Sequence, residues 1–314
     1  MITPNKRNYK SNTKIKNTIK KNKINTKRIK KSQTQKNFRR LNCSANKNNK
    51  INNFTCYSKN SLEKIKKMWN KRHPDKEIHT NDTREIWKQL KNNLKEVCST
   101  ERCWIKQKFM ENNLDSEMLN NTHAPNAPKS WKNNPTEWLT SIDIENVMKQ
   151  YEKEYPNFIF IGPSPIDFDK KLMFGECVWN DLCNINIIKL LKDGKNKIGI
   201  IFNTDPHYKD GSHWISLFID ISRKFIFYFD SNGDKVPKEV MNLIEKIEKQ
   251  GNQMNIDFTT YFNRKEHQYS NTECGMYSLY FLNQMITTNK TPREFNSKRI
   301  PDKDVKSLRK IYFN

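Results

Sequence analysis

Acidic side chains are missing from the first 60 residues of this 314-residue chain. That stretch carries 18 Lys and Arg residues, and the first acidic residue is Glu63. The remaining residues include 40 basic and 34 acidic side chains, so the formal charge of +24 belongs mainly to the N-terminal stretch. A segment so poor in aromatic residues buries too little apolar surface to offset the entropy lost on ordering. We therefore predict a disordered basic tail over residues 1–60, which either attracts nucleic acid or is only a solvated extension.

Long apolar runs are also missing. No stretch approaches the length of a transmembrane helix, and no early apolar core is typical of a signal peptide. The seven cysteines are an odd number and show no small disulfide framework. These absences favour an intracellular, reducing location, in which a thiol nucleophile would survive.

Helical patterns follow the tail. The clearest helix start is Asp82, a candidate N-cap with Glu85 three residues on and apolar residues at helical spacing beyond it. A stretch rich in Pro and Asn at 120–135 then indicates a connector. We predict a helical arm and connector over residues 61–135 and a separate domain over residues 136–314.

The separate domain mixes strand and helix patterns. Short apolar runs of strand length alternate with longer helical patterns, one of which covers residues 179–194 and is closed by Gly194. The last long apolar run follows Cys274 and is typical of a buried helix. This order predicts an α+β fold with a central mixed sheet flanked by helices.

Two of the predicted strands place a histidine and an aspartate at one end of the sheet. "HWISLFIDI" begins with His213 and "KFIFYFD" ends with Asp230, and a tight connection near residues 222–223 joins them. In such a hairpin Asp230 faces Ile215 and lies within about two residues of His213. Alone, an aspartate in "DSNGD" is more often a turn residue.

Cys274 opens the last helix in the sequence "ECGMY". Its sulfur would lie at the positive end of the helix, where a thiolate is favoured. Gly275 would leave room for a substrate backbone and offer its amide to an oxyanion, and Gln268 would offer a side-chain donor. An isolated cysteine before a helix is more often a small buried apolar residue, but the combination with His213 and Asp230 favours a nucleophile.

The other candidate sites are weaker. Cys98 and Cys103, like Cys177 and Cys183, lack the Cys-x2-Cys spacing of structural zinc sites, and we interpret the latter two as core thiols. We expect no metal site and no cofactor. His267 is expected to be an exposed loop residue next to Gln268, or else to line the cleft.

The ordered motifs resemble the signature of the adenain/SUMO-protease superfamily of cysteine peptidases. They are "HW" from residue 213, "FDS" from residue 229 and "Q-x5-CG" from residue 268. "WLTSIDIENVMKQY" is similar to the family motif in which a Trp opens a helix near the substrate cleft. The composition and helical arm most resemble polyprotein-processing members from large cytoplasmic DNA viruses.

The resemblance implies a role for each matching residue. Cys274 would be the nucleophile, His213 the general base and acid, and Asp230 the residue that orients the imidazole, with Asn232 as an alternative third member. Gln268 would donate to the oxyanion. Trp214 and Trp138 would flatten a substrate tail in a narrow channel, which explains the family's preference for Gly-Gly before the scissile bond. The usual "DCG" is "ECG" here, and Trp138 is followed by "LTSID" where "LND" is common.

Three functions follow from these motifs as expectations. The first is a cysteine endopeptidase that processes viral structural polyproteins in the host cytoplasm and is packaged in the virion. The second is a protease that removes SUMO or ubiquitin-like modifiers. The third is a basic nucleic-acid-binding virion protein on an inactive protease fold. Intact Cys274, His213, Asp230 and Gln268 argue against the third.

Overall fold

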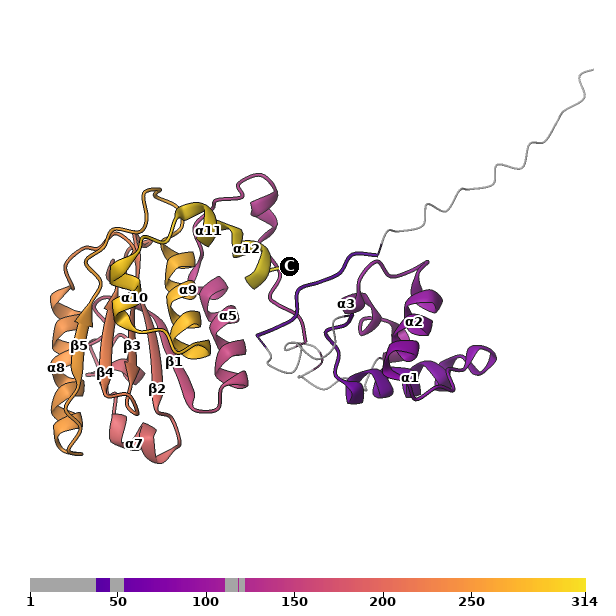
Figure 1. Cartoon of the computed structure of the whole chain (residues 1–314), viewed down its shortest axis with the longest axis horizontal. Helices are drawn as coiled ribbons and strands as arrows, with labels where there is room; N and C mark the ends of the chain where they lie inside the picture. Colours follow the sequence, from indigo (N-terminus) through magenta and orange to yellow (C-terminus); the bar gives the residue numbers. More distant parts are fainter. Residues whose placement is uncertain (1–37, 46–53, 111–117, 119–121) are drawn as a thin grey trace, which may run out of the picture. The chain divides into compact units, whose positions relative to one another are not determined.

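The computed structural model describes residues 38–45, 54–110, 118 and 122–314 (Figure 1). The predicted basic tail therefore lies mostly outside the described residues. Leu41, Cys56 and Tyr57 are buried, so ordered packing begins before the predicted boundary at residue 60. None of the helices in the described ranges is long and apolar enough to cross a membrane.

A helical module forms the N-terminal part of the described chain. Its elements are α1 (Lys59–Arg72), α2 (Thr83–Leu94), α3 (Glu101–Trp104) and the 3₁₀ turns η2 (Pro74–Lys76), η3 (Lys108–Met110) and η4 (Lys129–Lys132). As predicted, Asp82 caps α2, because its carboxylate accepts the backbone N–H of Glu85 at 2.8 Å. The apolar faces of α1 and α2 pack around Trp104 in a core of their own.

The domain that follows is built on a five-stranded sheet. The strands lie in the order β1-β2-β3-β4-β5, with bounds Phe158–Pro165, Lys197–Asn203, Trp214–Asp220, Phe225–Phe229 and Thr259–Phe262. The two outer pairs are parallel, whereas β2–β3 and β3–β4 are antiparallel. The predicted mixed sheet is therefore confirmed.

Helices cover both faces of this sheet (Figure 1). One apolar core joins the sheet to α5 (Ser141–Glu154) and α9 (Cys274–Thr287), and the other joins it to α7 (Ile187–Lys192) and α8 (Lys238–Asn252). The chain ends in three short helices beside α9, namely α10 (Pro292–Ser297), α11 (Asp302–Ser307) and α12 (Arg309–Tyr312). The nucleophile candidate thus opens the helix that packs on the centre of the sheet.

One predicted helix is wrong in its extent. Residues 179–194 form α6 (Asn180–Cys183) and α7 with a break between them. The break follows from Asn186, whose side chain accepts the backbone N–H of Lys189 and caps α7 as a new helix.

The cysteines pair more than the sequence predicts. Disulfides join Cys43 to Cys56, Cys98 to Cys103 and Cys177 to Cys183, and Cys274 is the free cysteine among the described residues. The interpretation of Cys177 and Cys183 as core thiols is therefore wrong. The Cα–Cα distances within the pairs are 5.1 to 6.2 Å, a proximity that cysteine spacing alone does not reveal.

Candidate active site

The hairpin of β3 and β4 brings His213 and Asp230 to one end of the sheet. Its register pairs Ser216 with Phe229 and Asp220 with Phe225, which is the predicted register. His213 immediately precedes β3 and Asp230 immediately follows β4. His213 Nε2 lies 2.7 Å from Asp230 Oδ1, so the two side chains are hydrogen-bonded.

The Asp230 carboxylate is itself held in place. Its Oδ1 also accepts the backbone N–H of Asn232 at 2.9 Å, and its backbone carbonyl accepts from the side-chain amide of Asn263. Asn232 therefore contacts Asp230 through its main chain, and the carboxylate of Asp230 is the group that bonds His213. This arrangement fixes the imidazole ring in one orientation.

Cys274 is the first residue of α9, where the backbone N–H groups of the first turn give a positive end. The residue is buried, with 2% of its surface exposed. Its thiol lies close enough to His213 to raise the pKa of the imidazole, and that imidazole is hydrogen-bonded to Asp230. Three residues from separate elements thus form one chain of contacts.

The charge on His213 depends on these contacts. Burial lowers the pKa of the imidazole, but the hydrogen bonds to Asp230 and Cys274, together with their negative charges, outweigh burial and raise the pKa to about 10. The site therefore favours an imidazolium at neutral pH. An imidazolium beside the sulfur stabilises a thiolate.

Gln268 lies in a buried position beside Ser231. The Ser231 hydroxyl donates to Gln268 Oε1 at 2.8 Å, and the backbone N–H of Gln268 donates to the Ser231 carbonyl at 2.9 Å. Because the oxygen of the amide is engaged, its Nε2 remains as the donor. Sequence reasoning identified Gln268 but missed Ser231, whose signal is its place next to Asp230.

Gly275 lies at a closely packed point at the start of α9. A Cβ at this position would lie 3.0 Å from Leu139 Cβ and 3.2 Å from Trp214 Cδ1. Leu139 and Trp214 therefore occupy the space beside this glycine. Trp214 Nε1 also donates to the Leu139 carbonyl at 3.0 Å, so the start of α9 packs tightly on these two residues.

An open cleft of about 550 Å³ lies on the other side of these residues. Trp138 and Trp214 both line it, together with residues of the β1 end and the loop before β3. Trp138 is 41% exposed and its Nε1 donates to the Asn271 carbonyl at 2.8 Å. Both tryptophans therefore border a cavity large enough for a peptide segment, although Cys274 does not line it.

A second His–Asp pair includes a residue that lines this cleft, His207. His207 Nδ1 is 2.7 Å from Asp167 Oδ2, and the His207 backbone N–H donates to Asp167 Oδ1. No cysteine lines this cleft, so the pair has no nucleophile beside it there. The short His–Asp distance therefore does not by itself mark the reactive centre.

Sequence reasoning missed the contacts that two buried residues near the nucleophile make. Glu273 accepts from Arg309 Nε at 2.9 Å in an ion pair whose side chains are 1% and 5% exposed. His267 is fully buried and its Nδ1 accepts the backbone N–H of Ile300 at 3.0 Å, so the expectation of an exposed loop histidine is wrong. Both contacts involve the C-terminal segment, with Arg309 in α12 and Ile300 between α10 and α11, and the distance in sequence hides the pairing.

The described residues include one group of side chains with metal-ligand chemistry, Cys56, Glu101 and His123 of the helical module. Cys98, Cys103, Cys177 and Cys183 are paired with each other and offer no thiolate. None of the residues in the His213–Cys274 site belongs to that group.

Comparison with known proteins identifies the family. Residues 190–314 match the Ulp1 protease family, C-terminal catalytic domain. A putative thiol protease of Acanthamoeba polyphaga mimivirus is 32% identical over 295 residues, which cover 86% of this chain and 92% of that protein. The chain belongs to the Ulp1 protease family. It is a cysteine protease, as the sequence motifs predict.

Other viral members of the Ulp1 family extend the similarity. The SUMO-1 cysteine protease of African swine fever virus, isolate Warthog/Namibia/Wart80/1980, is 27% identical over 241 residues, covering 69% of this chain and 83% of that protein. The crystal structure of the protease from African swine fever virus superposes with a TM-score of 0.61 at 24% identity. That match covers 87% of this chain and 95% of the other, so the fold extends to the described N-terminal residues.

Proposed function

We propose that this Ulp1-family protease is an endopeptidase with a Cys274–His213–Asp230 triad. One observation carries the proposal: the single free thiol of the described residues interacts with an imidazole that is hydrogen-bonded to a buried carboxylate. A thiol, a base and a group that orients the base are the parts that nucleophilic catalysis needs.

The reaction then runs through an acyl-enzyme. The Cys274 thiolate attacks the carbonyl carbon of the scissile bond, and the resulting oxyanion accepts hydrogen bonds from Gln268 Nε2 and a backbone amide at the start of α9. His213 gives its proton to the leaving amine, which departs and leaves a thioester. His213 next takes a proton from water, the hydroxide attacks the thioester, and the carboxylate product leaves as Cys274 is regenerated.

The substrate side of the proposal is a chain with Gly-Gly before the scissile bond. The tight packing of Gly275 on Leu139 and Trp214 leaves little room beside the nucleophile. Trp138 and Trp214 border the adjoining cleft. Residues without side chains fit such a passage, whereas larger ones collide with its walls. We assign Trp138 and Trp214 as substrate-binding residues on this ground.

We propose viral structural polyproteins as the substrates, because the mimivirus and African swine fever virus relatives are viral proteases. A protease of ubiquitin-like modifiers is the second candidate. It is favoured by the name of the relative in African swine fever virus, a SUMO-1 cysteine protease. Both candidates use the same three residues and differ only in what binds outside the active site.

Incubation with two substrates separates these functions. One is a peptide with an internal Gly-Gly-X sequence, and the other is a SUMO-linked protein. Cleavage of the peptide at a far higher kcat/KM supports polyprotein processing, and the reverse preference supports deconjugation. Cys274→Ala must abolish either cleavage, and a Cys274→Ala protein that still cleaves would overturn the triad.

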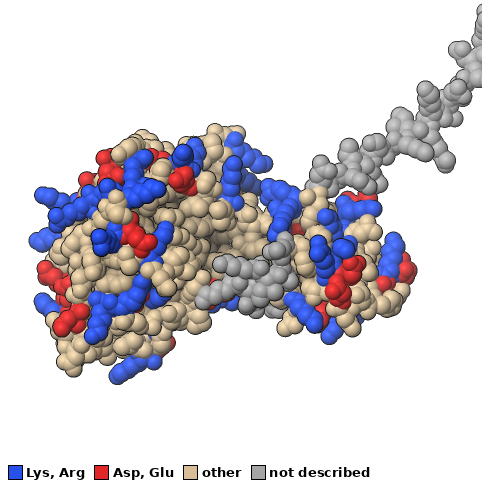
Figure 2. All heavy atoms as spheres, in the orientation of Figure 1, with Lys and Arg blue, Asp and Glu red and all other residues tan. Residues whose placement is uncertain are grey.

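The basic residues 1–37 lie outside the described structure, and we propose a nucleic-acid partner for them from their charge alone. On the described residues, Figure 2 shows Lys and Arg side chains interspersed with Asp and Glu on the visible face. Deletion of residues 1–37 should therefore remove most nucleic-acid binding, measured as a loss of salt-dependent retention on DNA. Packaging in the virion and location in the host cytoplasm are part of the same proposal, and immunolabelling of infected cells tests them.

A further inference from the structure

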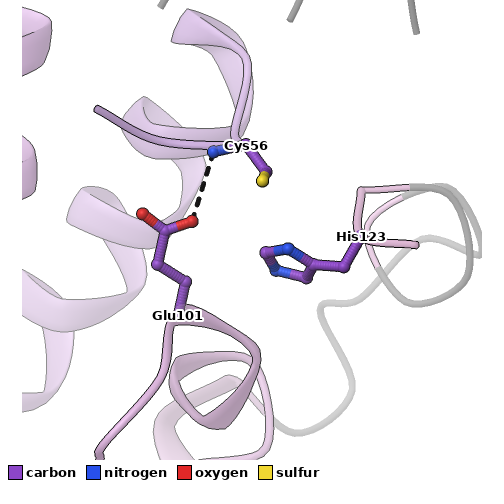
Figure 3. Close-up of side chains that lie close together, drawn as sticks. All are labelled: Cys56, Glu101 and His123. Atoms are coloured by element: carbon purple, nitrogen blue, oxygen red, sulfur yellow. Dashed lines mark hydrogen bonds between the residues drawn. The ribbon is translucent and has the colours of Figure 1, made fainter. Parts of the chain in front are cut away.

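Three buried side chains of the helical module converge on one point (Figure 3). Cys56 Sγ, a carboxylate oxygen of Glu101 and a ring nitrogen of His123 all lie within 4.8 Å of one another. They come from separate parts of the chain: the residues before α1, the first turn of α3 and the connector after η3. Figure 3 shows the His123 ring pointing towards the sulfur and the carboxylate.

A fourth ligand candidate, Cys43, is held beside His123 by the backbone. The two residues form an antiparallel bridge, with Ser44 N–H donating to the Thr122 carbonyl and Ala124 N–H to the Asn42 carbonyl. The Cys43 sulfur is within bonding distance of Cys56, to which the disulfide joins it. The backbone bridge therefore places Cys43 beside His123, and the disulfide places its sulfur beside that of Cys56.

The imidazole of His123 makes no hydrogen bond within the described protein. The residue is 3% exposed, and among the described residues neither of its ring nitrogens has a hydrogen-bond partner. Buried polar atoms are nearly always bonded, so an imidazole with two free nitrogens requires a partner of another kind. A metal ion that accepts a nitrogen lone pair would provide one.

Glu101 adds a buried carboxylate to the same point. It is 6% exposed, and its Oε2 accepts the Cys56 backbone N–H at 3.2 Å while its Oε1 accepts from Trp87 Nε1. These two bonds orient the carboxyl group, and a buried carboxylate is costly unless it is paired or bound to a metal. Ligand-orienting hydrogen bonds of this kind are typical around metal sites.

We propose that the reduced chain binds one Zn²⁺ through the Cys43 and Cys56 thiolates, His123 and Glu101. Two sulfurs, one imidazole and one carboxylate make a four-coordinate set of the type that favours zinc over harder cations. A metal bound at this site would link the segments at the two ends of the helical module to each other. The sequence alone predicted no metal site, because residues 43, 56, 101 and 123 do not follow a zinc-finger spacing.

Reduction is the step that opens the site. Two molecules of a monothiol such as glutathione break the Cys43–Cys56 bond, giving two protein thiols and one disulfide of the reductant. Each protein thiol releases a proton as its sulfur bonds Zn²⁺. The disulfide would therefore hold these segments together in an oxidising compartment. The metal would hold the same segments together in a reducing compartment.

Zinc titration of the full chain tests the proposal. Cys274→Ala serves as the background for every measurement, so that the active-site thiol cannot bind the metal. The reduced protein, competed against a chromophoric chelator, should bind one Zn²⁺ per chain, and His123→Ala should weaken binding on the order of 100-fold or more. His79→Ala, at an exposed histidine of the same module, and Cys98→Ser with Cys103→Ser are matched controls that should leave affinity unchanged.

Two further measurements keep the result decisive. Cobalt in place of zinc should give a thiolate-to-metal absorption band that disappears in Cys43→Ser. Because Cys43 is half-buried, this variant tests the site even if His123→Ala does not fold. The oxidised protein should bind neither metal. A reduced chain without bound zinc, equal affinity in His123→Ala and His79→Ala, or equal affinity before and after reduction would overturn the proposal.

Discussion

The helical module contains a buried histidine, His123, and the sheet domain a half-buried one, His213, and the two rings have opposite properties. Burial lowers the pKa of both imidazoles. In His123 the nearby positive charge of Arg102 lowers it further, to about 3, whereas in His213 the contacts with Asp230 and Cys274 raise it to about 10. Burial alone thus produces a neutral ring suited to bind a metal, and anionic partners produce a cation suited to transfer a proton.

Replacing each histidine by alanine should give the largest contrast. His213→Ala removes the group that takes and returns the proton, and we expect kcat to fall by about 10⁵- to 10⁶-fold on a Gly-Gly-X peptide. His123→Ala leaves the proton transfer intact and should keep kcat/KM within about threefold in oxidised protein, whose disulfide holds the module. Comparable losses in the two variants would contradict the distinction between them.

The carboxylate partner of His213 should matter next most. Asp230→Asn keeps the shape of the side chain but removes the charge that stabilises the imidazolium, and kcat should fall by about 10⁴-fold. Asp167→Asn alters the other His–Asp pair, which has no sulfur beside it in its cleft, and is the matched control. Steady-state hydrolysis by the two variants measures the difference, and an equal loss would mean that the His207 pair takes part in the chemistry.

The pH dependence should follow the raised pKa of His213. The imidazolium is the acid that protonates the leaving amine, so kcat/KM should decline as pH rises through about 10, where His213 loses its proton. In Asp230→Asn the pKa is no longer raised by that carboxylate, and the alkaline decline should move to lower pH. Rates between pH 7 and pH 11, with circular dichroism to confirm folding, test the sign, and an unmoved decline would exclude this assignment.

Gln268 and Ser231 should show a graded loss. Gln268→Ala removes an oxyanion donor and should lower kcat by about 10²- to 10³-fold. Ser231→Ala removes only the hydrogen bond that orients the Gln268 amide, so we expect a loss of about tenfold in kcat with little change in KM. A larger effect of Ser231→Ala than of Gln268→Ala would show that the orientation of the amide has another purpose.

Local patterns predicted the parts of the fold that depend on neighbours in sequence. The β3–β4 register follows from a short turn, and the cap of α2 follows from Asp82 alone. The meeting of His213 with Asp230 was therefore predictable from the hairpin. Cys274 could be assigned only because its spacing from these residues resembles a family pattern.

Sequence reasoning missed two kinds of contact. Some join residues that are distant in the chain, and others join residues within turns that the sequence does not reveal. The close packing of Gly275 against Leu139 and Trp214, which lie far from it in the chain, is one example. The Cys43–His123 bridge likewise spans the whole helical module. Periodicity and propensity describe single elements, and neither reports which side chains the packing of several elements brings together.

The buried pair of Glu273 and Arg309 has a consequence for biosynthesis. During translation the carboxylate next to the nucleophile leaves the ribosome 36 residues before its guanidinium partner. A buried charge without its partner costs about 3–5 kcal/mol, so a nascent chain that has exposed Glu273 but not Arg309 gains little by closing the first turn of α9. The packing beside the nucleophile therefore depends on a segment that is made 36 residues later.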